Sequence, residues 1–328
     1  MGMTYRRLGK AGLKVSAVAL GTWFTYGEGQ VDADEARRIL ETAYDLGVNY
    51  IDLADEYGLG EAERQVGAIL KPLPRHTLVL ASKVFFPMSK DVNDRGLSRK
   101  HIMESIDHSL RRLGTDYLDI YFCHRFDRDT PLEETARAMH DLVQQGKVLY
   151  WGTSEWSTMH IREAHRVCEH YGLHKPQVEQ SQYSMVVRQR VEGALLPVVR
   201  RYGIGLVVVS PLAHGLLTGK YDDGIPGDSR LGRRAASRAR YLHQEALEKV
   251  RQLKPLADRL GLSRAQLALA WLLRHEAVSS VITGVTSVAQ VRSNVGAAAV
   301  ALSEAVIEEI ARVLGRVEIP DAVIDASV

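Results

Sequence analysis

Four side chains that could together protonate a carbonyl oxygen occur where apolar segments of the chain end. Asp52 and Tyr57 follow NYI, Lys83 follows LVLAS, and His124 follows YLDIYFC. A tyrosine hydroxyl, with an ordinary pKa of about 10, is a weak acid at neutral pH. A neighbouring ammonium group stabilises the tyrosinate, and a carboxylate keeps that ammonium charged. These types fit hydride reduction of an aldehyde or ketone, with Tyr57 as the acid and His124 as a hydrogen-bond donor to the substrate oxygen.

Each of these residues also has an ordinary structural explanation. An aspartate at a strand end often caps the following loop, and tyrosine, lysine or histidine near a strand is often packed or solvated. Their common position at strand ends favours catalysis, because parallel strands in one sheet bring their carboxyl ends together. The catalytic interpretation therefore requires that these strands be parallel neighbours.

Eight short apolar segments alternate with amphipathic helical patterns that mostly begin at Ser, Asp or Pro and end at Gly. Short, continuous apolar strands are typical of parallel sheets buried on both faces. The sequence therefore predicts an α/β fold, a closed (β/α)8 TIM barrel with its active site at the C-terminal mouth, and a doubly wound sheet is the competing architecture. The expected strands are 16–21, 49–54, 78–84, 118–124, 148–154, 177–183, 205–210 and 279–284.

Two segments fall outside the repeating pattern. The N-terminal stretch TYRRLGKAGLKVS is expected to form a β-hairpin across the bottom of the barrel. Residues 219–241, after the seventh strand, form a long irregular loop, and such a loop in a barrel is usually functional. No repeat or linker divides the chain, so a single domain over 1–328 is expected.

Composition argues against several function classes. Lys plus Arg number 42 and Asp plus Glu number 40, so a net charge of +2 recruits neither nucleic acid nor an anionic membrane. The two cysteines, Cys123 and Cys168, cannot be the scaffold of 328 residues, which favours a reducing compartment. The N-terminus lacks a secretory pattern and no apolar run approaches the roughly 20 residues of a spanning helix. We therefore expect a cytoplasmic protein without membrane insertion.

Metal and Rossmann-type nucleotide sites have weaker support. The 12 histidines are scattered, and no HxxxH or CxxC pair lies near a strand mouth, so no metal is expected. The segment Gly58-Leu59-Gly60-Glu61-Ala62-Glu63 follows a strand and opens a helix but lacks the third glycine of a dinucleotide fingerprint. In a barrel these glycines would let the chain turn from Tyr57 into the next helix.

Longer motifs carry a family resemblance. NYIDLADEYGLGEAERQVG, the strand-end Lys83, YLDIYFCH and YWGTSEWS resemble the aldo-keto reductases, NAD(P)H-dependent carbonyl reductases built on a (β/α)8 barrel. GTWFTYGEGQV, RGLSRKHI, SPLAHGLLTGKYDDGIP and GVTSVAQVRSNVGA look closest to the potassium-channel β-subunit branch and its bacterial relatives. The resemblance, which runs from about residue 4 to 315, implies that Asp52, Tyr57, Lys83 and His124 form the catalytic tetrad. Channel β-subunits generally have Asn in place of His124, which favours a working reductase here.

The resemblance also implies a nicotinamide cofactor, with NADP(H) favoured over NAD(H) because a phosphate dianion is better held by charge-assisted bonds. Ser154 and Gln180 match positions that bind the nicotinamide carboxamide. Glu155 stands where most members have Asn, and Ser293 where an acidic residue often reads the adenine, so both roles are open. The other matched cofactor positions are Gly21, Thr22, Trp23, Asp52, Ser210, Pro211, Leu212, Ala213, Lys220, Arg230, Gly284, Thr286, Gln290 and Asn294.

Arg230 and the arginines that follow it in the sequence could form a solvated helix face instead of binding the cofactor or, less favoured, a patch that binds nucleic acid. Gln290 stands where members with a strong NADP preference often place Arg or Lys, and Arg292 is close by in sequence. The channel-related branch also has Gln there.

For the substrate pocket and the partners, the sequence predicts only general features. An apolar pocket around a small carbonyl substrate is expected, although each aromatic residue, including Tyr26, could equally pack under a loop. Arg125 and His214 could meet an anionic substrate. By resemblance we expect a homo-oligomer, a tetramer or larger, and the alternative function is a redox-sensing, cofactor-binding β-subunit of a potassium channel. The expected pocket residues are Trp23, Tyr57, Phe86, His124 and Trp156.

Overall fold

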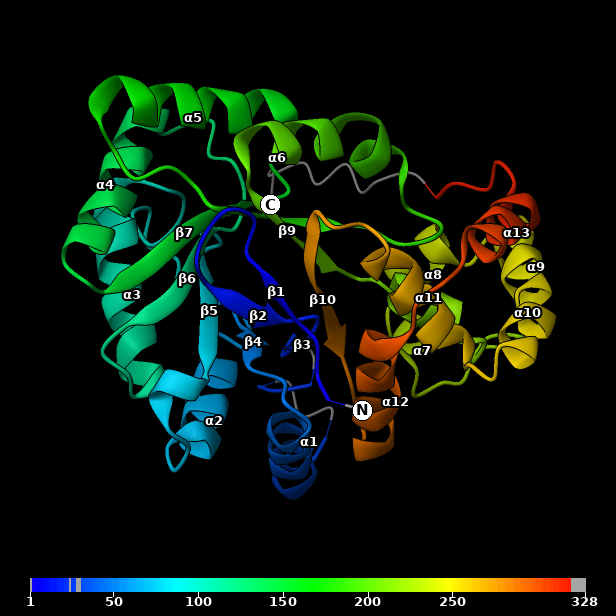
Figure 1. Cartoon of the computed structure of the whole chain (residues 1–328). Coiled ribbons are helices and arrows are strands. Elements are labelled where there is room, and N and C mark those ends of the chain that lie inside the picture. Colours follow the sequence, from blue (N-terminus) through cyan, green and yellow to red (C-terminus); the bar gives the residue numbers. More distant parts are fainter. Residues whose placement is uncertain (1, 24, 28–30, 320–328) are drawn as a thin grey trace.

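The computed structural model describes residues 2–23, 25–27 and 31–319, and its centre is a closed barrel of parallel strands (Figure 1). The strands follow one another around the barrel in chain order, and β10 closes it against β3. This confirms the predicted (β/α)8 barrel over the doubly wound sheet. Every strand but β10, which begins one residue earlier, lies within its predicted segment. The strands are β3 Val18–Gly21, β4 Tyr50–Asp52, β5 Val79–Val84, β6 Leu118–Cys123, β7 Val148–Ser154, β8 Val178–Gln182, β9 Gly205–Val209 and β10 Val278–Gly284.

Helices surround the barrel (Figure 1), and their ends match the expected caps. Asp32, Ser98 and Ser157 each accept a hydrogen bond from a backbone N–H in the first turn of their helix. Gly114 and Gly172 end two helices at φ of 67° and 65°, which glycine adopts without strain. The helices are α1 Ala33–Asp45, α2 Glu61–Leu70, α3 Arg99–Leu113, α4 Leu132–Gln144, α5 Thr158–Tyr171, α6 Leu196–Tyr202, α9 Gln244–Gln252, α10 Lys254–Arg259, α11 Arg264–Leu273, α12 Val288–Gly296 and α13 Glu304–Leu314. Short 3-10 turns occur at Arg75–Thr77 and Ala297–Ala299, and a π-helical turn at Val191–Leu195.

The predicted hairpin is present as β1 (Tyr5–Arg7) and β2 (Lys14–Ser16), which pair antiparallel across the N-terminal end of the barrel. Its buried Leu8 and Val15 belong to the same apolar cluster as residues at the beginnings of the barrel strands. The hairpin turn contains Gly9 at φ 58°, and a Cβ there would lie 2.3 Å from the carbonyl oxygen of Gly203. Glycine therefore lets the hairpin approach the barrel and close its bottom.

The long segment after β9 is more ordered than the sequence predicts. It contains the 3-10 segment η3 (Ala213–Thr218), α7 (Arg230–Arg233) and α8 (Ala235–Tyr241). Ser229 caps α7 by accepting a hydrogen bond from Gly232 N at 3.1 Å. The buried side chains of Tyr221, Leu231 and Tyr241 anchor this segment to the core, and the Tyr241 hydroxyl is bonded to the Gln182 amide.

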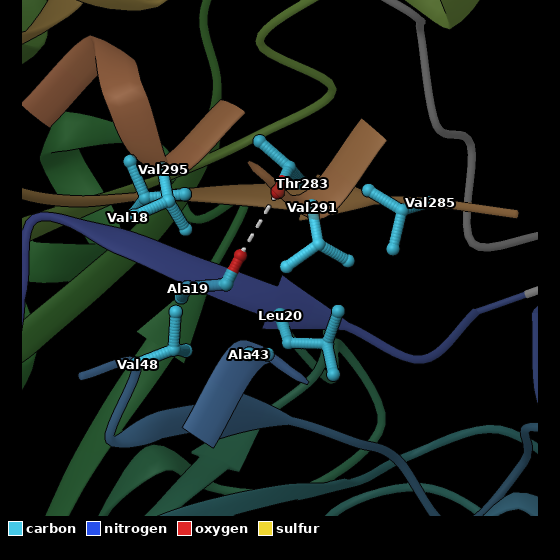
Figure 2. A pocket seen from close by; sticks show the side chains of 9 residues that line it. All are labelled: Val18, Ala19, Leu20, Ala43, Val48, Thr283, Val285, Val291 and Val295. Atoms are coloured by element: carbon cyan, nitrogen blue, oxygen red, sulfur yellow. Dashed lines mark hydrogen bonds between the residues drawn. The ribbon is translucent and has the colours of Figure 1, made fainter. Parts of the chain in front are cut away.

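A small apolar cavity of about 10 Å³ lies where β3 and β10 pack against α1 and α12 (Figure 2). Its single hydroxyl, on Thr283, donates to the Ala19 carbonyl at 3.2 Å. A space this small, with its polar group satisfied, is a packing cavity and not a ligand site. It is lined by Val18, Ala19, Leu20, Ala43, Val48, Thr283, Val285, Val291 and Val295.

Among the helices of the described residues, none combines the length and apolar character needed to cross a membrane. Likewise, no group of three or more His, Cys, Asp or Glu side chains that could hold a metal ion occurs within the described ranges.

Candidate active site

The barrel brings together three of the polar side chains from the strand ends. Lys83 is fully buried, and its Nζ donates to Asp52 Oδ2 at 2.8 Å, to Tyr57 Oη at 3.0 Å and to the Leu53 carbonyl at 2.5 Å. Strand register explains the meeting: Asp52 at the end of β4 pairs with Ala81 of β5. Lys83 lies two residues beyond Ala81 and therefore on the same face of the strand.

Tyr57 reaches this cluster through a tight turn after β4. Gly58, Leu59 and Gly60 have φ of 59°, 50° and 86°, all in the left-handed region. These conformations direct the chain from Tyr57 into α2, whose second residue, Ala62, donates its N–H to the Tyr57 carbonyl at 3.2 Å. The glycine-rich stretch that resembled a dinucleotide fingerprint is therefore the turn that places Tyr57.

His124 follows β6, and its N–H donates to the Val84 carbonyl of the neighbouring strand at 3.0 Å. Its ring centroid lies 6.2 Å from that of Tyr57 and 5.0 Å from that of Phe86, both edge to face. Burial, together with the charges of Arg125 and Lys83, holds the pKa of His124 well below its usual value. The imidazole is therefore neutral near pH 7.

The protonation states of Tyr57 and Lys83 suit proton donation. Burial raises the pKa of Tyr57 to about 12, although the Lys83 charge opposes the rise. Burial would lower the pKa of Lys83, but the nearby Asp52 carboxylate and Tyr57 outweigh it, so the pKa of Lys83 is raised. Near pH 7 the tyrosine carries its proton and the lysine its charge.

Ser154 and Gln180 lie beside this cluster, paired in register between β7 and β8. Both are buried, and Gln180 Nε2 donates to Asp52 Oδ1 at 2.7 Å. That bond leaves the carbonyl oxygen of the Gln180 amide as an acceptor, and Ser154 contributes a hydroxyl. A hydroxyl and an amide oxygen are the partners that a carboxamide group needs.

Glu155 has a structural role that its position in the sequence did not reveal. The residue has φ 57°, and its carboxylate accepts from Gln182 N at 2.5 Å and from Arg190 Nη1 at 3.0 Å. Arg190 Nη2 also donates to the Trp156 carbonyl at 2.8 Å. Glu155 and Arg190 thus brace the ends of β7 and β8.

Two aromatic residues flank the tetrad. The ring of Trp23, which is 41% exposed, stacks on Tyr57 with 6.2 Å between centroids, and the Arg230 guanidinium lies 4.7 Å from the Trp23 centroid. Phe86, which lies two residues after β5, packs against His124, which directly follows β6. Trp23 therefore links the segment after β9 to the tetrad, which places Arg230 near the predicted cofactor positions.

Two other aromatic candidates are packed beneath loops. Trp156 is fully buried, and its ring lies edge-on to Phe126 at 5.0 Å. Tyr26 is also fully buried, and its hydroxyl donates to the Ala36 carbonyl at 3.1 Å. Both fit the alternative of packing under a loop. Any contact of Trp156 with a substrate stays a prediction.

The backbone after β9 is strained where the resemblance places cofactor phosphates. Ser210, Ala213 and His214 have φ of 51°, 48° and 56°, a region that non-glycine residues seldom adopt. His214 is unsuited to an anion, because burial and the nearby arginines lower its pKa to about 2 and its ring stacks on Tyr241 at 4.2 Å. The expectation that His214 meets an anionic substrate is therefore not supported.

The predicted adenosine positions gather at the end of β10 and the start of α12. Gly284 pairs in register with Gly21, and a Cβ at Gly284 would meet open space. Gln290 Oε1 accepts from Thr286 N at 2.9 Å. Asn294 is buried on α12, and Thr22 donates its hydroxyl to the Asp52 carbonyl at 2.9 Å. The Gly284–Gly21 pairing and the Thr22–Asp52 bond connect the rim of the barrel at the end of β10 to the tetrad.

Sequence reasoning missed an acidic residue at this rim. Glu35 Oε1 accepts from Val288 N, in the first turn of α12, at 3.2 Å, and Glu35 Oε2 pairs with Arg38 at 2.6 Å. The contact joins α1 to α12 across 253 positions of sequence. No local pattern could have indicated it.

Comparison with known proteins supplies the family. The model of the aldo/keto reductase family matches residues 17–314. The chain belongs to this family. Membership supports an oxidoreductase activity and a nicotinamide cofactor.

Three similar proteins are named as β-subunits of voltage-gated potassium channels. A probable voltage-gated potassium channel subunit beta from Arabidopsis thaliana is 45% identical over 95% of this chain and 97% of its own length. One from Oryza sativa subsp. japonica is 45% identical over 90% and 91%. A putative voltage-gated potassium channel subunit beta from Schizosaccharomyces pombe is 44% identical over 89% of this chain and 87% of its own length. The predicted resemblance to this branch of the family is confirmed.

A second buried carboxyl supports the turn that carries Tyr57. Asp55 is fully buried; its Oδ1 accepts from Glu56 N at 2.7 Å and its Oδ2 from Ser105 Oγ of α3 at 2.9 Å. Burial, followed by the nearby Glu63 charge, raises the pKa of Asp55 to about 8. The folded protein therefore holds this proton more tightly than the unfolded chain.

Asp55→Asn should weaken the pH dependence of stability. Because the pKa of Asp55 is higher in the folded state, its contribution to stability is lost as pH rises from about 4 to about 8. We expect the free energy of unfolding of the wild type, relative to Asp55→Asn, to fall by about 2 kcal/mol or more between pH 5 and pH 9. Thermal unfolding at both pH values measures this, with the exposed Asp116→Asn as control; equal differences at both pH values would contradict it.

Proposed function

We propose that this protein is an NADP(H)-dependent reductase of aldehydes or ketones, with Tyr57 as proton donor. The observation that carries the proposal is the position of Lys83 Nζ, which contacts both Tyr57 Oη at 3.0 Å and Asp52 Oδ2 at 2.8 Å in a buried site beside a neutral His124. A buried ion pair held against a tyrosine hydroxyl is poorly explained by packing alone.

The side chains have distinct roles in this proposal. The Tyr57 hydroxyl donates its proton to the substrate oxygen as negative charge develops there. The Lys83 ammonium stabilises the resulting tyrosinate, and Asp52 keeps the ammonium charged and aimed. His124 is neutral and has one ring N–H; Nδ1 makes no hydrogen bond within the described residues, and the N–H is placed on Nε2, which donates it to the substrate oxygen.

The site fits a nicotinamide cofactor, which supplies the hydride when bound. Ser154 and Gln180 would hold its carboxamide, and Trp23 would lie beside its ring. The segment 210–213, with Lys220 and Arg230, would hold the ribose and phosphates. Gly21, Thr22, Gly284, Thr286, Gln290 and Asn294 would complete the rim.

Glu35 provides a test of the cofactor preference. If the 2′-phosphate of NADPH lies at the start of α12, the carboxylate beside Val288 N opposes it. Glu35→Gln removes that charge and releases Arg38, so both changes should strengthen NADPH binding. We expect the ratio of the NADH Kd to the NADPH Kd, measured by titration, to rise roughly two- to tenfold. Glu41→Gln, on the same helix, is the matched control, and an unchanged ratio in Glu35→Gln would place the phosphate elsewhere.

A second candidate function is favoured by the names of the relatives. The alternative is a cofactor-binding, redox-sensing β-subunit of a potassium channel with little turnover. His124 argues for turnover, because an imidazole N–H beside Tyr57 suits a developing oxyanion. Co-purification of the full chain with a channel, without turnover of any aldehyde, would favour the alternative.

Carbonyl reduction can be tested directly with the purified full chain. The absorbance of NADPH or NADH is followed with a panel that includes 4-nitrobenzaldehyde, methylglyoxal and glyceraldehyde 3-phosphate. We expect aldehyde-dependent oxidation of NADPH, faster than that of NADH. No oxidation with any member of the panel, in protein that binds NADPH, would reject the reductase.

The proposal includes a cytoplasmic location and a homo-oligomer, a tetramer or larger. Light scattering of the purified protein measures the assembly, and a monomer would reject that part alone.

A further inference from the structure

Arg125 lies at the mouth of the barrel next to the proposed tetrad. Its Nη1 donates to the His124 carbonyl at 2.5 Å and lies 3.5 Å from Ser154 Oγ. Its guanidinium carbon is 5.5 Å from the centroid of Phe86, whose ring is 5.0 Å from that of His124. Phe86 therefore lies next to both the Arg125 guanidinium and the His124 ring that would meet the substrate oxygen.

The charge of Arg125 is not balanced as those of its neighbours are. Lys83 pairs with Asp52, and Arg190 pairs with Glu155. Arg125 forms no ion pair with any residue in 2–23, 25–27 or 31–319, and its Nε is buried without a hydrogen bond there. The two contacts of Nη1 are with an uncharged carbonyl and a hydroxyl.

Such an arrangement leaves the charge of Arg125 available to an anion. Arg125 is half-buried, its Nε makes no hydrogen bond within the described residues, and the neutral acceptors of Nη1 replace only part of the hydration that burial removes. Its planar donors match a carboxylate or a phosphate, which can accept two hydrogen bonds at once. The charge also acts on the site itself, since it helps to keep His124 neutral.

We propose that Arg125 is a specificity-determining residue that binds a carboxylate or phosphate group of the carbonyl substrate. The inference rests on the proposed reductase function and adds the substrate class: small aldehydes or ketones with an anionic group near the carbonyl. Phe86 lies between the two ends of such a substrate and packs against its carbon skeleton. Tyr57 and His124 meet the carbonyl oxygen.

Paired probes that differ in charge test this role. 4-Carboxybenzaldehyde is compared with methyl 4-formylbenzoate, and glyceraldehyde 3-phosphate with glyceraldehyde. We expect the wild type to prefer the anionic member of at least one pair in kcat/KM. In Arg125→Met that preference should fall roughly tenfold to a hundredfold, as expected for the loss of a charge-assisted hydrogen bond.

The ratio within a pair separates recognition from general damage. A loss of folding or of cofactor binding lowers kcat/KM for both members equally, whereas loss of anion binding lowers only the charged one. Arg125→Lys, which keeps the charge, should retain part of the preference, and Arg128→Met, on the exposed surface of the same loop, should retain all of it.

The outcomes are distinct. If the Arg125-dependent ratio is larger for the first pair, the anion is a carboxylate; if it is larger for the second, the anion is a phosphate. Equal kcat/KM within both pairs in the wild type, or a preference that survives in Arg125→Met, would overturn the inference. Turnover of the neutral probes with either result shows that the reductase function itself stands, and no turnover of any probe rejects that function instead.

Discussion

Replacing Tyr57 with Phe should lower kcat/KM for aldehyde reduction by about 10² to 10⁴, the range that a general acid contributes. The variant loses one hydroxyl, which lies 3.0 Å from Lys83 Nζ, and keeps the ring that stacks on Trp23. Burial raises the pKa of Tyr57 to about 12, so the wild-type residue carries its proton throughout the neutral range. Ionisation of Tyr57 should therefore not contribute to the pH profile of wild-type kcat/KM between pH 6 and 8.

The measurement needs to separate chemistry from binding. Steady-state kinetics give kcat/KM, and quenching of protein fluorescence gives the Kd of NADPH, which we expect to stay within about threefold of the wild type because Ser154 and Gln180 are untouched. Tyr44→Phe is the matched control: its hydroxyl is bonded to Thr77 and to none of the tetrad. Turnover in Tyr57→Phe equal to that of the control would remove Tyr57 from the acid role.

Much of the fold could be predicted because strands buried on both faces are marked by short apolar runs. The segment 148–154 has the same bounds in sequence and structure. The short helices α7 and α8 could not be predicted, because four and seven residues rich in Arg carry no readable apolar period. They are held by the burial of Leu231 and Tyr241, a tertiary effect.

The tetrad could be predicted as a group because strand register converts sequence order into position around the barrel mouth. Contacts that depend on the direction of a side chain could not be predicted from the sequence. Glu155 looked like a substituted cofactor residue until its carboxylate was seen to bind Arg190, 35 positions away. Arg125 and His214 were both candidates to bind an anion. His214 is stacked on Tyr241 and neutral, whereas Arg125 contacts the His124 carbonyl and Ser154 and makes no ion pair inside the described ranges.

Lys83→Met should combine the loss of activity with a large loss of stability. The Lys83 ammonium and the Asp52 carboxylate are both buried, 2.8 Å apart. Removing one partner leaves the other charge in the interior, which costs about 3–5 kcal/mol. Gln180 Nε2 would remain as a hydrogen-bond donor to Asp52, at 2.7 Å, but it carries no charge. Denaturant unfolding at pH 7 measures the loss.

The control is a lysine whose ion pair is exposed to water. Lys147 pairs with Asp107 at 2.6 Å, with side chains 32% and 48% exposed, so Lys147→Met should cost less than about 1 kcal/mol. A similarly small loss of stability in Lys83→Met would mean that water reaches the Asp52 carboxylate. The tetrad would then not be the buried site on which the proposed function depends.

A double variant separates the two roles of Lys83. In Lys83→Met/Asp52→Asn no charge is left unpaired, so we expect most of the lost stability to return, with a coupling of about 2 kcal/mol or more between the sites. Activity should not return with it, because the Tyr57 hydroxyl still lacks the ammonium that stabilises its conjugate base. Recovery of both together would show that Lys83 serves only the fold. Recovery of stability alone assigns to Lys83 a part in proton donation that folding does not require.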